Sequence, residues 1–285
     1  MKTNSKYLGL VTKKFNDFFL VDLKNQENSG NSEKFLCKVK KSINFKDQLI
    51  YVGDEVVIDN IDLKSKRAVI TSLKKRKNLL ARPSVANISN IYITFSVEEP
   101  ELNLSQVNRF LISAESMGVE VSLVLTKCDL ISDKKQIFLL DKFKKWGYQA
   151  IILNLHKSDH FEDLLAQLKK KKCSIFMGPS GVGKTTLLNK IIPGLQNSTA
   201  PVSNKIKRGK NTTRNVELFS ISNQSYIVDT PGFNMQPLEV DIRLLPNLFS
   251  EIYKQVIDEG IRCKFRDCLH SVSYTHLRAH ETIVH

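Results

Sequence analysis

The sequence lacks any run of about 18 to 20 apolar residues, so no segment of it predicts a membrane-spanning helix. Residues 1–10 also lack the continuous apolar core of a secretory signal. Cysteine is scarce, with five among 285 residues, and three of these lie singly in apolar segments, namely Cys37, Cys128 and Cys173. Isolated cysteines of this kind are typical of reduced core residues, so we expect a cytoplasmic protein.

Acidic residues are too few to balance the basic ones. The chain has 43 Lys and Arg against 29 Asp and Glu, which gives a formal net charge of +14. Such an excess indicates a polyanionic partner such as nucleic acid, although composition alone favours a merely basic surface about equally. With 285 residues and 41% hydrophobic content, the chain is long enough for two packed domains and a small appendage.

The most specific motif is GPSGVGKT at residues 178–185, which matches the phosphate-binding pattern G-x-x-x-x-G-K-[ST] at each fixed position. A predicted buried strand at 173–177 precedes it and a predicted helix follows. This context disfavours a chance glycine-rich turn, because backbone N–H groups at a helix N-terminus bind phosphate. We expect Lys184 to bridge the β- and γ-phosphates and the Thr185 hydroxyl to bind Mg²⁺.

The N-terminal region, residues 7–80, predicts a small β-barrel, and an OB-type barrel is the usual nucleic-acid-binding choice. Five short apolar segments of strand length carry this prediction: residues 7–11, 17–21, 35–39, 50–58 and 68–73. Basic residues at the edge of the barrel are Lys64, Lys66, Arg67, Lys74, Lys75, Arg76 and Lys77. They could face RNA, but a charge run alone more often indicates a solvated linker.

Residues 81–172 alternate between strand and helix patterns, which predicts a parallel sheet with helices on both faces. The predicted strands are 90–97, 120–125 and 150–153, and the predicted helices are 105–117, 138–146 and 161–172. The second strand leads into Thr126-Lys127-Cys128-Asp129. Asp129 could accept from both N1–H and N2–H₂ of guanine, which adenine does not offer, and Lys127 would lie across the base. T-K-x-D is weak alone, but its place after a buried strand favours function.

Two further segments follow the phosphate loop. Residues 200–217 are polar and basic and predict a mobile loop, in which Thr212 or Thr213 could reach the γ-phosphate and its Mg²⁺. An ordinary disordered loop is the alternative. A predicted strand at 225–228 then ends in Asp229-Thr230-Pro231-Gly232, where Asp229 would hold the metal through water and the Gly232 amide could sense the γ-phosphate.

The order of these motifs is a circular permutation of that in familiar small GTPases, because T-K-C-D precedes the phosphate loop and D-T-P-G. With the N-terminal barrel and a C-terminal Cys/His cluster, residues 7–270 resemble the ribosome small-subunit-dependent GTPase A family. The motifs that carry the resemblance are residues 82–87, 178–186, 209–214 and 229–233. The resemblance implies GTP hydrolysis stimulated by the small ribosomal subunit, a role in its late maturation, and contact between the barrel and ribosomal RNA.

The resemblance also implies a zinc site in the pattern C-x₄-C-x-H, formed by Cys263, Cys268 and His270. The family continues with a fourth cysteine where this sequence has His276, so a Cys₂His₂ site and a weaker three-ligand site both remain open. Residues 271–285 resemble nothing in the family, and we expect a tail that is not native to it.

Three positions depart from common GTPase patterns. Phe233 follows D-T-P-G where many GTPases have a water-orienting glutamine, and the family shares this change, which predicts slow intrinsic turnover. Asn211 stands where many relatives have histidine. Thr126 replaces the more usual asparagine of the base motif, which predicts some loss of nucleotide affinity.

The predicted fold is α/β, with an OB-type barrel at 1–80, a circularly permuted P-loop GTPase domain at 81–248, a small helical zinc-binding region at 249–271 and the tail at 272–285. The predicted nucleotide site comprises Thr126, Lys127, Cys128, Asp129, Gly178, Pro179, Ser180, Gly181, Val182, Gly183, Lys184, Thr185, Thr186, Asp229 and Gly232. Lys184, Thr212 and Thr213 are the predicted catalytic residues, and Thr185 and Asp229 the predicted magnesium ligands.

The expected cofactors are GTP or GDP, Mg²⁺ and Zn²⁺. We expect a monomer that binds the small ribosomal subunit and its RNA, with neither DNA nor membrane as a partner. Two alternatives remain open: a P-loop enzyme of another class, such as a kinase or an ATPase, and a nucleotide-binding RNA-binding protein without significant catalysis.

Overall fold

The computed structural model describes residues 2–3, 6–23, 33–40, 49–81, 83–155, 160–193, 195, 216–222, 224–229 and 248. The chain divides into two compact units. Unit 1 contains residues 1–89, 167–175 and 188–231, and unit 2 contains residues 90–166, 176–187 and 232–285. The predicted site residues Thr212, Thr213, Gly232, Cys263, Cys268 and His270 lie outside the described residues.

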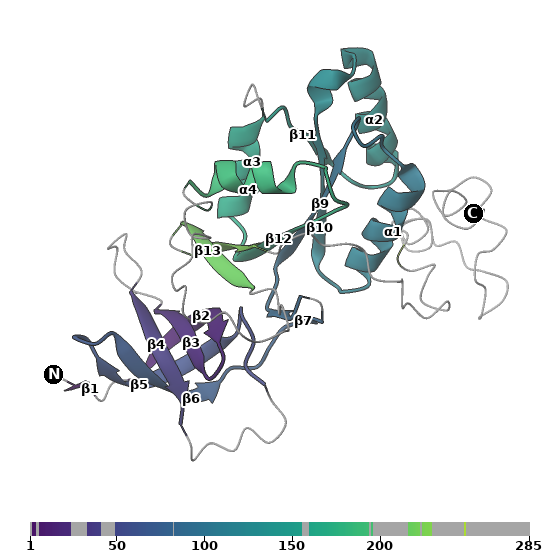
Figure 1. Cartoon of the computed structure of the whole chain (residues 1–285). Coiled ribbons are helices and arrows are strands. Elements are labelled where there is room, and N and C mark those ends of the chain that lie inside the picture. Colours follow the sequence, from purple (N-terminus) through teal and green to yellow (C-terminus); the bar gives the residue numbers. More distant parts are fainter. Residues whose placement is uncertain are drawn as a thin grey trace, which may run out of the picture. The chain divides into compact units, whose positions relative to one another are not determined.

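Unit 1 begins with a five-stranded barrel of OB-like order (Figure 1). Its strands are β2 (Tyr7–Phe15), β3 (Phe18–Leu23), β4 (Lys34–Val39), β5 (Glu55–Asp62) and β6 (Arg67–Leu73). Antiparallel pairing joins β2 to β3 and β3 to β4, and parallel pairing joins β4 to β6. Strand β6 then pairs with β5, and β5 returns to β2, which closes the barrel. The short β1 (Lys2–Thr3) extends the edge of β5.

Alternating apolar side chains fill the barrel, as a strand period of two requires. In β3 these are Phe19, Val21 and Leu23, and they pack with Phe35 and Cys37 of β4 in one buried cluster. Burial raises the pKa of Cys37 to about 12, so this thiol stays protonated in the core. The predicted barrel is therefore confirmed, and side chains fill its centre.

One predicted strand begins later than expected. The pattern at 50–58 predicts a strand, but β5 begins only at Glu55 because a turn comes first. Gly53 lies in this turn with a φ of +89°, and a Cβ there would lie 2.1 Å from the Ala86 carbonyl oxygen. Only glycine allows this close approach to the short pair β7 (Leu79–Leu80) and β8 (Val85–Ala86).

Unit 1 also contains three strands from the second half of the chain. They are the first part of β12 (Cys173–Met177), β13 (Glu217–Ser222) and β14 (Ser225–Asp229). Strand β14 runs parallel to β12, with Tyr226 opposite Cys173, and antiparallel to β13. Strand β13 in turn pairs with the barrel strand β2, where Glu217 lies opposite Lys13. The barrel and these strands thus form one continuous set of paired strands.

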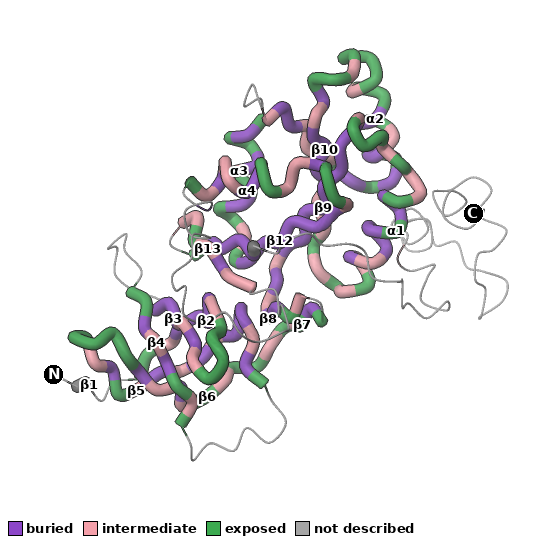
Figure 2. The backbone as a smooth tube through the Cα atoms, viewed as in Figure 1, coloured by how far each residue is buried: buried purple, intermediate pink, exposed green. Residues whose placement is uncertain are grey.

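Unit 2 is a parallel sheet with helices. From the end of β12 the order continues through β9 (Asn90–Ser96), β10 (Glu120–Thr126) and β11 (Ala150–Ile152). Every residue of β9 is buried, as expected for a strand covered on both faces (Figure 2). Helices α1 (Leu104–Glu115) and α2 (Asp133–Lys145) cover one side. The first turns of α3 (Phe161–Lys169) and α4 (Lys184–Ile191) lie on the other (Figure 1).

The predicted alternation of strand and helix is confirmed, with one clear difference in a helix boundary. Helix α2 begins at Asp133, five residues before the predicted start, because the side chain of Ser132 accepts from the Lys135 amide and caps it. No helix in the part of the chain that the structure describes is long and apolar enough to cross a membrane.

Candidate nucleotide-binding site

The phosphate loop follows β12 directly, and its first glycine is required by a close backbone contact. A Cβ on Gly178 would lie 2.0 Å from the Thr94 carbonyl oxygen of β9, so no larger residue fits without moving backbone. Two later glycines of the loop, Gly181 and Gly183, have φ values of +84° and +90°, and helix α4 begins at Lys184. The strand, loop and helix thus have the local geometry with which backbone N–H groups bind phosphate.

The ammonium group of Lys184 lies inside the curve of the loop. Its Nζ donates to the carbonyl oxygen of Gly178 at 2.8 Å and to that of Pro179. The side chain is half-buried, and burial lowers its pKa. A phosphate oxygen that enters the loop can replace these carbonyls as an acceptor. The hydroxyl-bearing Thr185 and Thr186, in the first turn of α4, are exposed to solvent.

The base motif is bonded directly to the phosphate loop. Thr126 ends β10 with no exposed surface, and its Oγ1 donates to the Val182 carbonyl oxygen at 2.6 Å. The Phe95 carbonyl oxygen is a second, longer acceptor at 3.3 Å. The sequence predicted both motifs but not this bond. The sequence signal that could have found this bond is the Thr126 hydroxyl directly after the buried apolar residues 123–125, because a buried hydroxyl needs a hydrogen-bond partner.

The other residues of the base motif differ in accessibility. Lys127 has a left-handed φ of +56°, and its Nζ donates to the Glu99 carbonyl oxygen. Cys128 is 2% exposed, and burial raises the pKa of its thiol to about 11, so it supports the turn rather than lining a site. Asp129 is exposed in a short 3₁₀ turn, η1 (Cys128–Leu130), where its carboxylate is open to a ligand.

The remaining described site residue, Asp229, is the last residue of β14 in unit 1, opposite Glu217 of β13. The structure therefore brings the base motif and the phosphate loop together in unit 2, whereas Asp229 belongs to the same unit as the barrel. Among the described residues no group of three or more His, Cys, Asp or Glu side chains could hold a metal.

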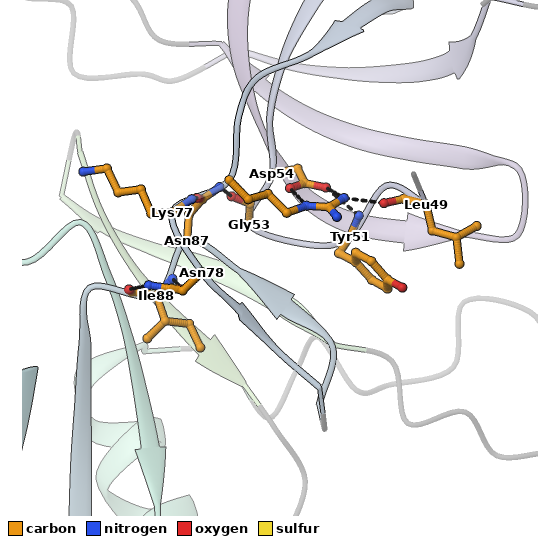
Figure 3. A network of polar contacts seen from close by, with 9 residues as sticks. Leu49, Tyr51, Gly53, Asp54, Lys77, Asn78, Asn87 and Ile88 are labelled. Carbon is orange, nitrogen blue, oxygen red and sulfur yellow. Dashed lines mark hydrogen bonds and ion pairs between the residues drawn. The ribbon is translucent and has the colours of Figure 1, made fainter. Parts of the chain in front are cut away.

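The basic edge of the barrel contains one internal arginine. The Arg76 guanidinium donates to both carboxylate oxygens of Asp54, at 2.6 Å from Nε and 2.7 Å from Nη2, and also to the Leu49 carbonyl. Asp54 is fully buried and also accepts from the Tyr51 amide at 2.8 Å (Figure 3). The hydrogen bond to Asp54 raises the pKa of Arg76. Arg76 thus belongs to the structure of the barrel, unlike its exposed neighbours Lys74, Lys75 and Lys77.

Two asparagines hold the segment after Arg76 together, and one of them, Asn87, also bonds to the barrel turn at Gly53. Asn87 donates from Nδ2 to the Gly53 carbonyl and accepts from the Lys77 amide, at 2.9 and 2.8 Å. Asn78 donates to the Ile88 carbonyl and accepts from the Ile88 amide, both at 2.9 Å (Figure 3). Asn87, part of the 82–87 motif, therefore has a structural role in holding this segment.

This permuted order of motifs, on a barrel followed by a parallel sheet, matches a known family. The model of the RsgA GTPase matches residues 73–239. The chain belongs to the RsgA GTPase family. The protein is thus a GTP hydrolase by family, and the predicted resemblance is confirmed.

Relatives of the RsgA family match most of the chain. The small ribosomal subunit biogenesis GTPase RsgA of Prochlorococcus marinus strain NATL2A is 38% identical over 274 residues, 94% of this chain and 87% of that protein. The protein of the same name from Synechococcus sp. strain CC9605 is 39% identical over 241 residues, 85% of this chain and 79% of that protein.

Two solved structures share the fold. YjeQ from Thermotoga maritima has a TM-score of 0.72 at 28% identity, covering 94% of this chain and 87% of its own. YloQ, described as a circularly permuted GTPase, has a TM-score of 0.76 at 25% identity, covering 97% of this chain and 91% of its own. The predicted fold class, a permuted GTPase domain with an N-terminal barrel, is confirmed.

Proposed function

We propose that this protein is a GTPase that binds the small ribosomal subunit and assists its late maturation. It hydrolyses GTP to GDP and phosphate, and the subunit stimulates this reaction. The curated relatives are named small ribosomal subunit biogenesis GTPases, which supports the partner. The observation that carries the nucleotide assignment is the hydrogen bond from Thr126 to the Val182 carbonyl, which holds a guanine-type base motif against a phosphate loop.

The proposed roles in the nucleotide site follow from the chemistry of each residue. Asp129 accepts from the guanine base, and the stem of Lys127 covers its face. The amides of the phosphate loop and Lys184 hold the phosphates and neutralise charge that develops on the γ-phosphoryl group in the transition state. The exposed start of α4 leaves the Thr185 hydroxyl free to reach a cation, so this residue fits Mg²⁺.

Other proposed roles depend on motifs in the sequence. Asp229 is the second magnesium residue, Gly232 contacts the γ-phosphate, and Thr212 and Thr213 are the catalytic-loop residues. Zinc bound by Cys263, Cys268 and His270 would order the 249–271 region, because thiolates and imidazole are the ligands that zinc prefers. The proposed domains are the barrel at 1–80 and the GTPase domain at 81–248.

The barrel is the proposed contact with ribosomal RNA. Exposed basic residues follow its edge and the segment after it: Lys64, Lys66, Arg67, Lys74, Lys75 and Lys77. With a net charge of +14, they give the electrostatic attraction that RNA phosphates require. Arg76 is left out of this set because Asp54 already binds it. The protein acts as a monomer in the cytoplasm, where its partner is found.

Hydrolysis of GTP and ATP, measured with and without purified small ribosomal subunits, tests the proposal. We expect GTP-selective turnover that rises by orders of magnitude with subunits. Asp129→Asn should weaken GTP binding and favour xanthosine triphosphate, while a Thr186→Ala control keeps the GTP preference. Equal use of ATP and GTP would contradict the guanine assignment. Subunit binding without any turnover would favour the non-catalytic RNA-binding alternative.

A further inference from the structure

One acidic side chain of the barrel is buried where water is expected. Phe19, Val21 and Leu23 of β3 point into the barrel core, so alternation places Asp22 on the outer face. A carboxylate on the outside of a barrel strand is normally solvated. Asp22 nevertheless has no exposed surface, and its register partner on β2, Leu10, is only 5% exposed. Another element therefore covers the outer face of β2 and β3.

Tyr226 of β14 lies over this face. Its hydroxyl donates to Oδ2 of Asp22 at 3.0 Å, and the tyrosine itself is 5% exposed. Burial, and then the neighbouring Asp22 carboxylate, raise the pKa of Tyr226 above its usual range, so the phenol keeps the proton it donates. The two residues are 204 positions apart in the sequence, and both belong to unit 1.

Two ion pairs lie around the buried contact. Lys13 of β2 pairs with Glu217 of β13, and these two residues also oppose each other in the strand register. Lys172, just before β12, pairs with Glu55 at the start of β5. Partly exposed pairs of this kind add little free energy one by one. They add two side-chain contacts between the barrel and the segments of β12 and β13.

Strand β14 leads from the buried contact to the proposed magnesium residue. Asp229 lies three residues after Tyr226 on the same strand. The start of the strand is anchored separately, because Ser225 Oγ lies 2.7 Å from the carbonyl oxygens of Leu168 and Lys171. The contact to Asp22 therefore lies between this anchored start and Asp229 at the end of the strand.

We propose that the hydrogen bond between Asp22 and Tyr226 couples occupancy of the barrel to the placement of Asp229, which makes these two residues positioning residues for the subunit-stimulated hydrolysis of GTP. The inference rests on the proposed function, in which the small subunit binds the barrel. A buried polar contact is either made or broken, which is the discrete behaviour that coupling requires. Coupling between two binding sites is reciprocal, so nucleotide state must also change subunit affinity.

Variants of the pair test this coupling. Tyr226→Phe removes the donor and keeps the ring, and Asp22→Leu removes the acceptor while it keeps the branched shape of the side chain. We expect an intrinsic kcat close to that of the wild type and stimulation by subunits reduced about tenfold. The double variant should lose no more than either single variant, because both remove one interaction. The Thr12→Val control removes another buried hydroxyl of β2, which bonds within the barrel to the Leu20 carbonyl, and should keep full stimulation.

A second measurement separates positioning from simple loss of stability. The affinity for subunits is determined with GDP and with a non-hydrolysable GTP analogue. In the wild type the two affinities should differ, and in Tyr226→Phe this difference should become smaller. Glu217→Gln weakens the partly exposed ion pair with Lys13 and should also reduce stimulation, but by a smaller factor.

The outcomes are distinguishable. If subunits stimulate the wild type, and the two single variants of the pair and the double variant all keep full stimulation, the coupling is refuted and the proposed function stands. If the wild type shows neither stimulation nor nucleotide-dependent subunit binding, both are refuted. If stimulation is lost together with intrinsic turnover in each variant, the pair only maintains the fold, and the positioning role is refuted.

Discussion

Arg76→Ala should destabilise the barrel far more than any neighbouring lysine substitution. The Asp54 side chain is fully buried, and Arg76 supplies two of its hydrogen bonds while only 19% of the arginine side chain is exposed. Removing one partner of such a pair leaves a buried charge, which costs about 3 to 5 kcal/mol. Loss of the guanidinium from the face of the Tyr51 ring, 4.9 Å away, adds about 0.5 to 1 kcal/mol.

Urea unfolding of the full chain, followed by fluorescence and circular dichroism, measures this change as a shift of the midpoint. Lys75→Ala is the matched control, because it removes an exposed positive charge of the same segment and should change stability by less than about 0.5 kcal/mol. For RNA affinity the order of the two effects should be reversed, with the larger loss in Lys75→Ala. Lys75→Ala is expected to weaken RNA binding and reduce its salt dependence, whereas folded Arg76→Ala should bind RNA nearly as the wild type does.

A second substitution checks the physical reason. If the cost arises from an unpaired carboxylate, then Asp54→Asn in the Arg76→Ala background should recover part of the lost stability. The reasoning would be refuted by an Arg76→Ala protein that unfolds within about 1 kcal/mol of the wild type. If Arg76→Ala lost as much RNA affinity as Lys75→Ala does, Arg76 would instead be a residue that binds RNA.

Two further predictions concern the nucleotide site. Thr126→Val removes the donor to the buried Val182 carbonyl, worth about 1 to 3 kcal/mol, so GTP affinity should fall by up to about 100-fold, while Thr126→Ser stays near the wild type. Equal affinities of the two variants in a fluorescent-nucleotide titration would contradict this role. Gly178→Ala places a Cβ 2.0 Å from the Thr94 carbonyl and should abolish nucleotide binding. Gly118→Ala, with open space but a φ of +63°, should cost only about 1 to 2 kcal/mol in thermal unfolding and leave binding intact.

Local patterns in the sequence were sufficient to predict most of the strands and helices. Alternation in β3 and continuous apolar runs in β9 identify strands buried on one or both faces. The parallel pairing of β4 with β6 could not be derived from local patterns, because it depends on closure of the whole barrel. The late start of β5 was also missed, since it depends on contact between Gly53 and Ala86, 33 residues away in the chain.

In the nucleotide site, too, contiguous motifs could be predicted from the sequence, whereas contacts between distant residues could not. The phosphate loop and T-K-C-D are contiguous and could be found from spacing alone, but the bond that joins them spans 56 residues. The charge run at 74–77 could not indicate which member is internal. The sequence feature that could have identified Arg76 is its partner Asp54, which directly follows the turn glycine Gly53. The burial of Asp54, which makes a charged partner necessary, is known only from the structure.

The permuted order has a consequence for what a partner of the barrel can change. The base motif and phosphate loop belong to unit 2, whereas Asp229 shares unit 1 with the barrel. The hydrogen bond from Tyr226 to Asp22 thus joins the barrel to the strand that ends at Asp229, the proposed magnesium residue. Subunit binding should therefore raise kcat for GTP much more than it changes the affinity for GDP, which has no γ-phosphate. Stopped-flow GDP binding and single-turnover hydrolysis with and without subunits measure both quantities. A change in GDP affinity as large as the change in kcat would show that the partner acts on the base motif or phosphate loop instead.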